Sequence, residues 1–138
     1  MAKINKTALL EAALKARQGA YAPYSKYKVG AAVLGKSGKI YGGANVENAS
    51  YGLVICAERT AIFKAITEGE KEILAIAIVT ADIASPCGAC RQVMAEFMAP
   101  SAPVLIASDN KGKPGAVTEK KLRDYYPFPF DAASLKIK

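Results

Sequence analysis

The residues of this chain that are suited to catalysis are three cysteines and a glutamate, in a sequence that contains no histidine. Cys56 stands two positions before Glu58, and Cys87 and Cys90 follow as a Cys-x-x-Cys pair. Three thiolates can hold a zinc ion and leave its fourth position open, which distinguishes catalytic zinc sites from structural ones. A carboxylate next to such an ion can transfer protons. The spacing therefore predicts a hydrolytic zinc enzyme.

Other uses of the cysteines stay open at this level. A Cys-x-x-Cys pair can be a redox pair, and a structural zinc site would need a fourth ligand that the sequence does not reveal. Free thiols in the core are a third alternative. Neither core thiols nor a redox pair explains the Cys56-x-Glu58 spacing. The absence of histidine excludes Ser-His-Asp triads, Cys–His pairs and His-x-x-x-His zinc sites.

A zinc site of three cysteines would also require a positive charge nearby. Three thiolates outweigh the two charges of zinc, so a cation is expected beside them. Arg59 and Arg91 each follow a cysteine motif directly. We expect Arg59 to donate a hydrogen bond to a ligand sulfur and so compensate its charge, although the sequence leaves Arg91 as an alternative.

Composition predicts one domain over residues 1–138, since 138 residues with 51% hydrophobic side chains suffice for a substantial core. The formal net charge is +7, but lysine and arginine are spread along the chain, which favours a solvated surface over a nucleic-acid partner. No apolar run approaches the ~18–20 residues of a membrane span, and the N-terminal segment lacks the apolar core of a signal peptide. We expect a cytoplasmic protein that binds neither nucleic acid nor membrane.

Helical and extended patterns alternate along the chain, which predicts an α/β fold with helices on the faces of a sheet. The expected helices cover residues 7–17, 56–66, 87–98 and 118–125. The expected strands cover residues 28–34, 40–46, 73–79, 104–107 and 116–117. The run over 73–79 is continuously apolar, as in a strand that is covered on both faces.

Two motifs carry a family resemblance. Cys-Ala-Glu-Arg-Thr-Ala at 56–61, followed by Pro-Cys-Gly-Ala-Cys-Arg-Gln at 86–92, resembles the zinc-dependent cytidine deaminases, in their small homotetrameric branch. The likeness extends to residues 21–26, 29–32 and 45–51, so it covers roughly residues 5 to 130. It implies a three-layer α/β/α sandwich around a five-stranded mixed sheet.

The resemblance also implies an activity. It is the hydrolytic deamination of cytidine and 2′-deoxycytidine to uridine and 2′-deoxyuridine, with release of ammonia, as in pyrimidine salvage. By this mapping Cys56, Cys87 and Cys90 hold one Zn²⁺ per subunit, and Glu58 shuttles protons between a zinc-activated water and the base. The backbone N–H of Ala57 matches a group that binds the pyrimidine O2.

Further residues match substrate contacts of the family. Asn45 and Glu47 match the pair that holds the ribose 3′-hydroxyl, and Tyr27 stands where the family commonly has a phenylalanine near the base. Tyr51 and Phe130 resemble residues that reach the site of a neighbouring subunit. The resemblance therefore implies a homotetramer whose sites are shared between subunits.

Three rival functions differ from this one in a recognisable way. A deaminase of another aminated compound, such as an aminonucleoside antibiotic, would have less need of Asn45-x-Glu47 and of the Tyr24-Ser25 loop. An enzyme that edits cytosine within polynucleotides would need a basic track beside the pocket. A non-enzymatic zinc module would have no use for Glu58.

Overall fold

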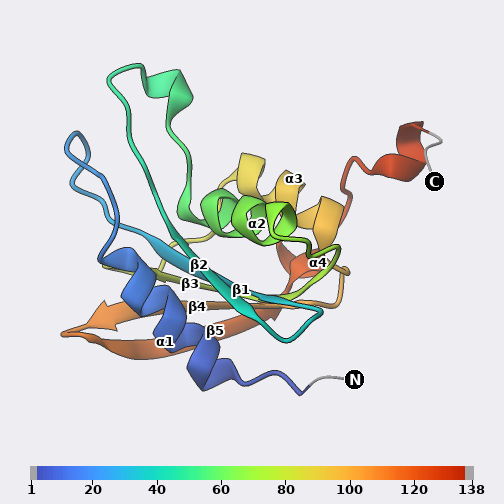
Figure 1. The fold of residues 1–138 in the computed structure, drawn as a ribbon, viewed down its shortest axis with the longest axis horizontal. Coiled ribbons are helices and arrows are strands. Elements are labelled where there is room, and N and C mark those ends of the chain that lie inside the picture. The colour runs from blue at the N-terminus through green and yellow to red at the C-terminus, as the bar shows by residue number, and fades with distance from the viewer. Residues whose placement is uncertain (1–2, 136–138) are drawn as a thin grey trace.

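The computed structural model describes residues 3–135, which build a five-stranded mixed sheet with helices on both faces (Figure 1). The helices are α1 (Lys6–Arg17), α2 (Ala57–Thr67), α3 (Gly88–Phe97) and α4 (Leu122–Tyr125), with the short 3₁₀ turns η1 (Tyr51–Leu53) and η2 (Ala132–Leu135). The strands are β1 (Gly30–Gly35), β2 (Ile40–Ala44), β3 (Ile73–Thr80), β4 (Pro103–Asn110) and β5 (Lys113–Lys121).

The strand order is β2-β1-β3-β4-β5, in which β3 and β4 run parallel and the other neighbours run antiparallel. Helix α1 covers one face of the sheet, and α2 and α3 lie on the other (Figure 1). The three-layer α/β/α fold predicted from the sequence is confirmed. The ends of the predicted domain, residues 1–2 and 136–138, lie outside the described residues.

Alternation along the strands divides the core into two layers. On β1, Ala31 and Val33 pack in the cluster under α2, whereas Ala32 and Leu34 pack in the cluster under α1. Strand β3 is buried on both faces, as its continuous apolar run predicted. The sheet is therefore a rigid support for any site built at its edge.

Helix α1 is fastened at both ends. The Asn5 side chain accepts a hydrogen bond of 3.0 Å from the backbone N–H of Ala8, which caps the first turn. At the other end, the Arg17 guanidinium pairs with Asp109 at 2.6 Å and donates to the Lys28 carbonyl at 2.9 Å. These contacts tie α1 to β4 and to the chain that leads into β1.

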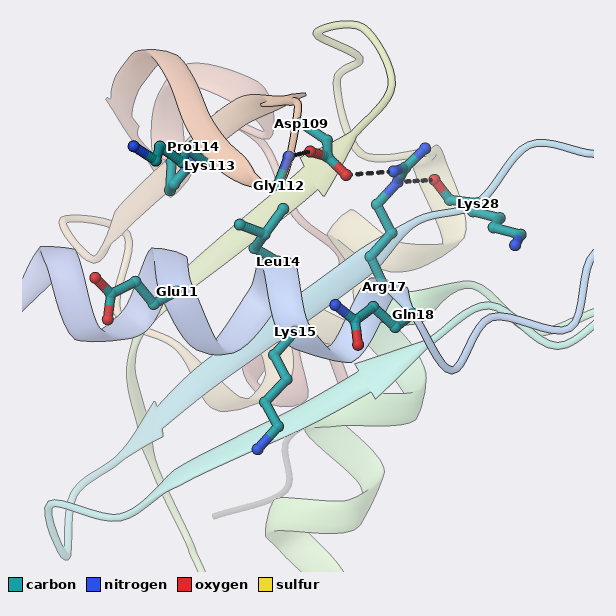
Figure 2. Close-up of a pocket in the computed structure, with 10 residues that line it drawn as sticks. All are labelled: Glu11, Leu14, Lys15, Arg17, Gln18, Lys28, Asp109, Gly112, Lys113 and Pro114. Carbon is teal, nitrogen blue, oxygen red and sulfur yellow. Dashed lines mark hydrogen bonds and ion pairs between the residues drawn. The ribbon is translucent and has the colours of Figure 1, made fainter.

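A cavity of about 490 Å³ lies beside this ion pair, between α1 and the β4–β5 hairpin (Figure 2). Its charged side chains do not converge on a common point. Arg17 faces Asp109, while Lys15 and Lys28 extend away from that pair (Figure 2). The arrangement fits a structural clasp rather than an anion site.

Helix α2 approaches the sheet at backbone distance. A Cβ added to Gly43 of β2 would lie 2.5 Å from the Ala61 backbone nitrogen, which is far inside van der Waals contact. Only glycine permits this approach. The approach holds α2 against the sheet near the start of the helix, where Cys56 and Glu58 lie.

The structure corrects the prediction for the C-terminal elements. Residues 118–121, expected to open a helix, continue strand β5, and the helix that follows is the single turn α4. Strand β5 pairs with β4 from Asn110↔Lys113 to Pro103↔Lys121. The exposed lysines and glutamate of β5 do not show the alternation that marks a strand in sequence. The strand forms because it pairs with the buried strand β4, which outweighs local propensity. The expected strands at 28–34 and 40–46 are also shorter, at 30–35 and 40–44.

Residues 3–135 contain no helix that is both long enough and apolar enough to cross a bilayer.

Candidate active site

The three cysteines meet where α2 and α3 begin. Cys56 is the N-cap residue of α2 and Cys87 that of α3, and neither makes a side-chain cap hydrogen bond. Cys90 lies in the first turn of α3 and is fully buried. The Sγ atoms are 3.7 Å apart between Cys56 and Cys87 and 3.2 Å apart between Cys87 and Cys90. Within residues 3–135 they form the one group of metal-ligating side chains found, with all sulfurs within 4.8 Å.

These sulfurs fit a zinc ion. Tetrahedral zinc with Zn–S bonds of about 2.3 Å places two sulfurs about 3.8 Å apart, close to the Cys56–Cys87 separation. Helix N-termini carry partial positive charge, which favours the thiolate form that binds metal. The donor set is soft and leaves room for a fourth ligand, so the group is positioned for metal binding.

The thiols of Cys56 and Cys90 shift each other's pKa in opposite directions. Hydrogen bonding from Cys90 and Arg59 lowers the pKa of Cys56 to about 5, although burial opposes this. The pKa of Cys90 is raised, first by its hydrogen bond to Cys56 and then by burial. One thiolate among the three sulfurs is thus stabilised by its neighbours.

The two arginines after the motifs have different surroundings. The Arg59 guanidinium donates to Cys56 Sγ at 3.5 Å, and its buried Nε makes no hydrogen bond within the described chain. Arg91 donates instead to the Pro86 and Tyr125 carbonyls, at 2.8 and 3.0 Å. The geometry therefore favours Arg59 over Arg91 as the cation beside the sulfurs.

Glu58 lies in the first turn of α2 and is 5% exposed. Burial raises the pKa of its carboxyl to about 7, outweighing the hydrogen bonds from its own backbone and from Cys90. A carboxyl that titrates near neutrality can both accept and return a proton. Residues two apart within a helix do not share a face, but Cys56 and Glu58 lie close to the same cavity because Cys56 precedes the helix rather than lying within it.

Glu58, Cys56 and Cys87 line a cavity of about 290 Å³, near the lower end of ligand pockets, and Cys90 is buried behind them. The start of α2 and the end of β3 form part of its wall, and the loops over 21–29 and 81–87 and the segment over 45–56 complete it. Lining residues are Ser25, Tyr27, Val29, Asn45, Glu47, Val54, Ile55, Cys56, Ala57, Glu58, Ile78, Thr80, Ala84, Ser85 and Cys87. Seven of these lining residues were predicted for the site from the sequence: Tyr27, Asn45, Glu47, Cys56, Ala57, Glu58 and Cys87.

Asn45 and Glu47 brace the loop over 21–29. Asn45 is buried, donates from Nδ2 to the Tyr27 carbonyl at 2.8 Å and accepts from the Val29 N–H at 2.9 Å. The Glu47 carboxylate accepts from the backbone and hydroxyl of Ser25 and from another backbone N–H, which lowers its pKa. One N–H of Asn45 and one lone pair of Glu47 Oε2 remain by this count. A donor and an acceptor side by side suit a ligand hydroxyl.

Tyr51 and Phe130 lie outside this cavity. Tyr51 is 74% exposed and its ring packs edge-on against Tyr24, with centroids 5.9 Å apart. Phe130 is 56% exposed, and its carbonyl accepts from Gln92. The cavity of one chain is therefore formed without either ring.

Thr80 lies in the cavity and Asp82 contacts a residue that lines it, and neither was predicted from the sequence. Thr80 lines the cavity, and Asp82 accepts a hydrogen bond of 2.8 Å from the Tyr27 hydroxyl. The available signal was a threonine at the carboxyl end of a buried apolar strand, a common place for functional side chains.

The geometry agrees with comparisons to known proteins. The model of the cytidine and deoxycytidylate deaminase zinc-binding region matches residues 3–106. A cytidine deaminase of Halalkalibacterium halodurans is 59% identical over 91 residues, 64% of this chain and 69% of that protein. The crystal structure of cytidine deaminase from Burkholderia pseudomallei has a TM-score of 0.83 at 46% identity, over 92% of this chain and all of that one. That from Mycobacterium tuberculosis has a TM-score of 0.76 at 37% identity, over 93% and 98%. The chain belongs to the cytidine and deoxycytidylate deaminase family.

Proposed function

We propose that this chain is a zinc-dependent cytidine deaminase that converts cytidine and 2′-deoxycytidine to the corresponding uridines and ammonia. The observation that carries the proposal is a group of three thiols, two of which line one cavity together with the buried Glu58 carboxyl. The names of the relatives support the same activity. A role in pyrimidine salvage follows from this chemistry.

Cys56, Cys87 and Cys90 would hold one zinc ion per subunit. When bound, zinc supplies a Lewis acid that makes water nucleophilic at neutral pH. Glu58 accepts one proton of the attacking water on a carboxylate oxygen and returns it to N3 of the base. It then accepts the second proton of that water, from the oxygen now on C4, and passes it to the departing amine. The Ala57 N–H holds the base carbonyl O2, and Arg59 offsets the excess negative charge of the sulfurs.

The charge of the cavity favours a nucleoside over a nucleotide. Its lining includes Glu47 and Glu58, and none of the described lining residues is lysine or arginine. A 5′-phosphate would meet carboxylates without a partner cation, which is unfavourable. The spare donor of Asn45 and the spare acceptor of Glu47 instead suit the ribose 3′-hydroxyl.

A homotetramer with shared sites is part of the proposal. Tyr51 extends from the loop that carries η1, and Phe130 from the segment after α4 that projects from the body of the chain (Figure 1). Large exposed aromatic rings on projecting segments are suited to insertion into a second copy. In the assembly they would line the cavity of a neighbouring subunit.

The test is uridine formation from cytidine by the purified, zinc-loaded protein, with Glu58→Ala measured in parallel. We expect conversion by the parent and its loss in the variant, at unchanged zinc content. A folded, zinc-loaded parent that converts neither nucleoside would refute the proposed substrate. Retained activity in Glu58→Ala would refute the proton shuttle.

A further inference from the structure

We propose that Thr80 is a specificity residue that hydrogen-bonds the ribose 2′-hydroxyl, so that the enzyme prefers cytidine to 2′-deoxycytidine. This inference rests on the proposed function and names the part of the substrate that a further side chain recognises.

The first support is the position of Thr80. It is the last residue of β3, and its side chain follows Ile76 and Ile78 on the sheet face that carries α2. Ile76 is enclosed in the core, whereas Ile78 and Thr80 also line the active-site cavity. Thr80 thus occupies the point at which the strand passes from core to site.

The second support is an unpartnered polar atom. The Thr80 side chain is 2% exposed, and its Oγ1 makes no hydrogen bond of normal geometry among the described residues, although the Tyr27 hydroxyl lies close to it. A buried hydroxyl without a partner destabilises the fold, and valine would fill the same space without that cost. Packing therefore does not explain the hydroxyl, but a ligand that hydrogen-bonds it does.

The third support is the neighbouring Tyr27. Its hydroxyl donates to Asp82, so its proton is engaged and its remaining lone pairs are available as acceptors. Burial and the Asp82 hydrogen bond raise the pKa of Tyr27, while the nearby Thr80 hydroxyl acts in the opposite direction. Tyr27 and Thr80 together offer an acceptor and a hydroxyl that either donates or accepts. That pair is complementary to one hydroxyl group of a ligand.

The fourth support is adjacency to the proposed 3′-hydroxyl site. Asn45 donates to the Tyr27 carbonyl, so Asn45 and Tyr27 lie on one wall of the cavity. If Asn45 and Glu47 hold the 3′-hydroxyl, the next polar group around the sugar ring is the 2′-hydroxyl. With the base turned toward Glu58 and Ala57 as proposed, the Tyr27 hydroxyl and Thr80 remain for the sugar.

The experiment compares kcat/KM for cytidine and 2′-deoxycytidine in the zinc-loaded parent, Thr80→Val and Thr80→Ser. Valine keeps the shape and removes the hydroxyl, whereas serine keeps the hydroxyl. We expect the parent to favour cytidine and Thr80→Val to reduce that ratio by about tenfold, mainly through KM for cytidine. Thr80→Ser should retain the ratio of the parent.

Tyr27→Phe is the second variant, because it removes the phenolic oxygen while keeping the ring. It should also lower the ratio, and the double variant should lose less than the product of the single losses, since both side chains bind one hydroxyl. An equal ratio in the parent and Thr80→Val would overturn this inference and leave the proposed function intact. A parent inactive on both nucleosides would instead refute the proposed function, and this inference with it.

Discussion

Two buried glutamates associated with α2 have opposite environments. Glu58, in the first turn, is 5% exposed, and burial raises the pKa of its carboxyl to about 7. Glu70, just after the helix ends, is 7% exposed, but it accepts hydrogen bonds from Ser37 and from the Tyr41 hydroxyl. These bonds, led by that of the Ser37 hydroxyl, lower the pKa of Glu70.

The contrast shows how the environment of the carboxyl that we propose to be catalytic differs from that of a structural one. Glu70 is surrounded by donors that stabilise its charge, so it fastens the β1–β2 turn to the end of α2 and stays ionised. Glu58 is buried with weaker compensation and faces a cavity, so protonation and deprotonation are close in free energy. The surroundings, rather than the residue type, assign the two roles.

Replacing Glu58 with glutamine should have the largest effect. We expect kcat to fall by about 10²- to 10⁴-fold, because the amide neither accepts nor returns a proton. The melting temperature should stay equal or rise, because a poorly solvated carboxyl is removed. Steady-state rates, thermal melts and zinc content check this. A variant with near-normal kcat would remove the distinction between the two glutamates.

Arg59→Gln tests the cation beside the same helix start. Loss of the guanidinium next to Cys56 should weaken zinc affinity by about 10- to 100-fold, as for other groups that support metal ligands. Competition with a chelator measures it. The matched control is Arg17→Gln on the opposite sheet face, where the guanidinium pairs with Asp109. Equal zinc affinity in Arg59→Gln and the parent would contradict the role of Arg59.

Glu70→Gln should show the reverse of Glu58→Gln. The free energy of unfolding at neutral pH should fall, since the charge-assisted bonds from Ser37 and Tyr41 are weakened, while kcat/KM is retained. Urea titrations and rate measurements on the same samples check it. Lost activity at unchanged stability would show that Glu70 serves catalysis rather than the fold.

The pH dependence of stability provides a further test of the role of Glu70. Because the pKa of Glu70 is lower in the folded than in the unfolded protein, its contribution is complete above the unfolded pKa. It is lost as pH falls through the folded pKa. The stability difference between the parent and Glu70→Gln should therefore shrink as the solution is acidified. A difference that stays constant into the acid range would contradict the assignment.

The smallest effect is expected at the start of α1. Asn5→Ala removes the side-chain cap to Ala8 and should cost about 1 kcal/mol of unfolding free energy, with no change in kcat. Asn5→Ser, which keeps a capping oxygen, is the control. The helices that begin at Cys56 and Cys87 have no such cap, since these positions carry thiols. A loss of activity in Asn5→Ala would contradict the division between a structural start of α1 and the candidate site at the starts of α2 and α3.

The sequence predicted those parts of the molecule that depend on local spacing. The helix starts at the two cysteine motifs and the apolar strand at 73–79 follow from short patterns, and the structure has them within a residue or two. The motifs also named Cys56 and Glu58, which the structure places at one cavity. The roles of these residues stay predictions until they are measured.

Features that depend on distant segments could not be predicted. Tyr27 meets Asp82 only because the loops before β1 and after β3 close over one cavity. Arg59 and Arg91 are equivalent in sequence, and only packing against Pro86 and Tyr125 separates them. Strand β5 was predicted too short, at 116–117 instead of Lys113–Lys121, because a polar edge strand lacks apolar alternation and depends on its pairing with β4.

The close approach of Gly43 to Ala61 has a consequence for how freely this protein can diverge. The loops that wall the cavity can change side chains and thereby shift substrate choice without moving the sheet. At position 43 even a methyl group would displace the first turn of α2, and with it Cys56 and Glu58 together. Laboratory evolution toward new substrates therefore has latitude in the loops over 21–29 and 81–87, and none where helix and strand touch.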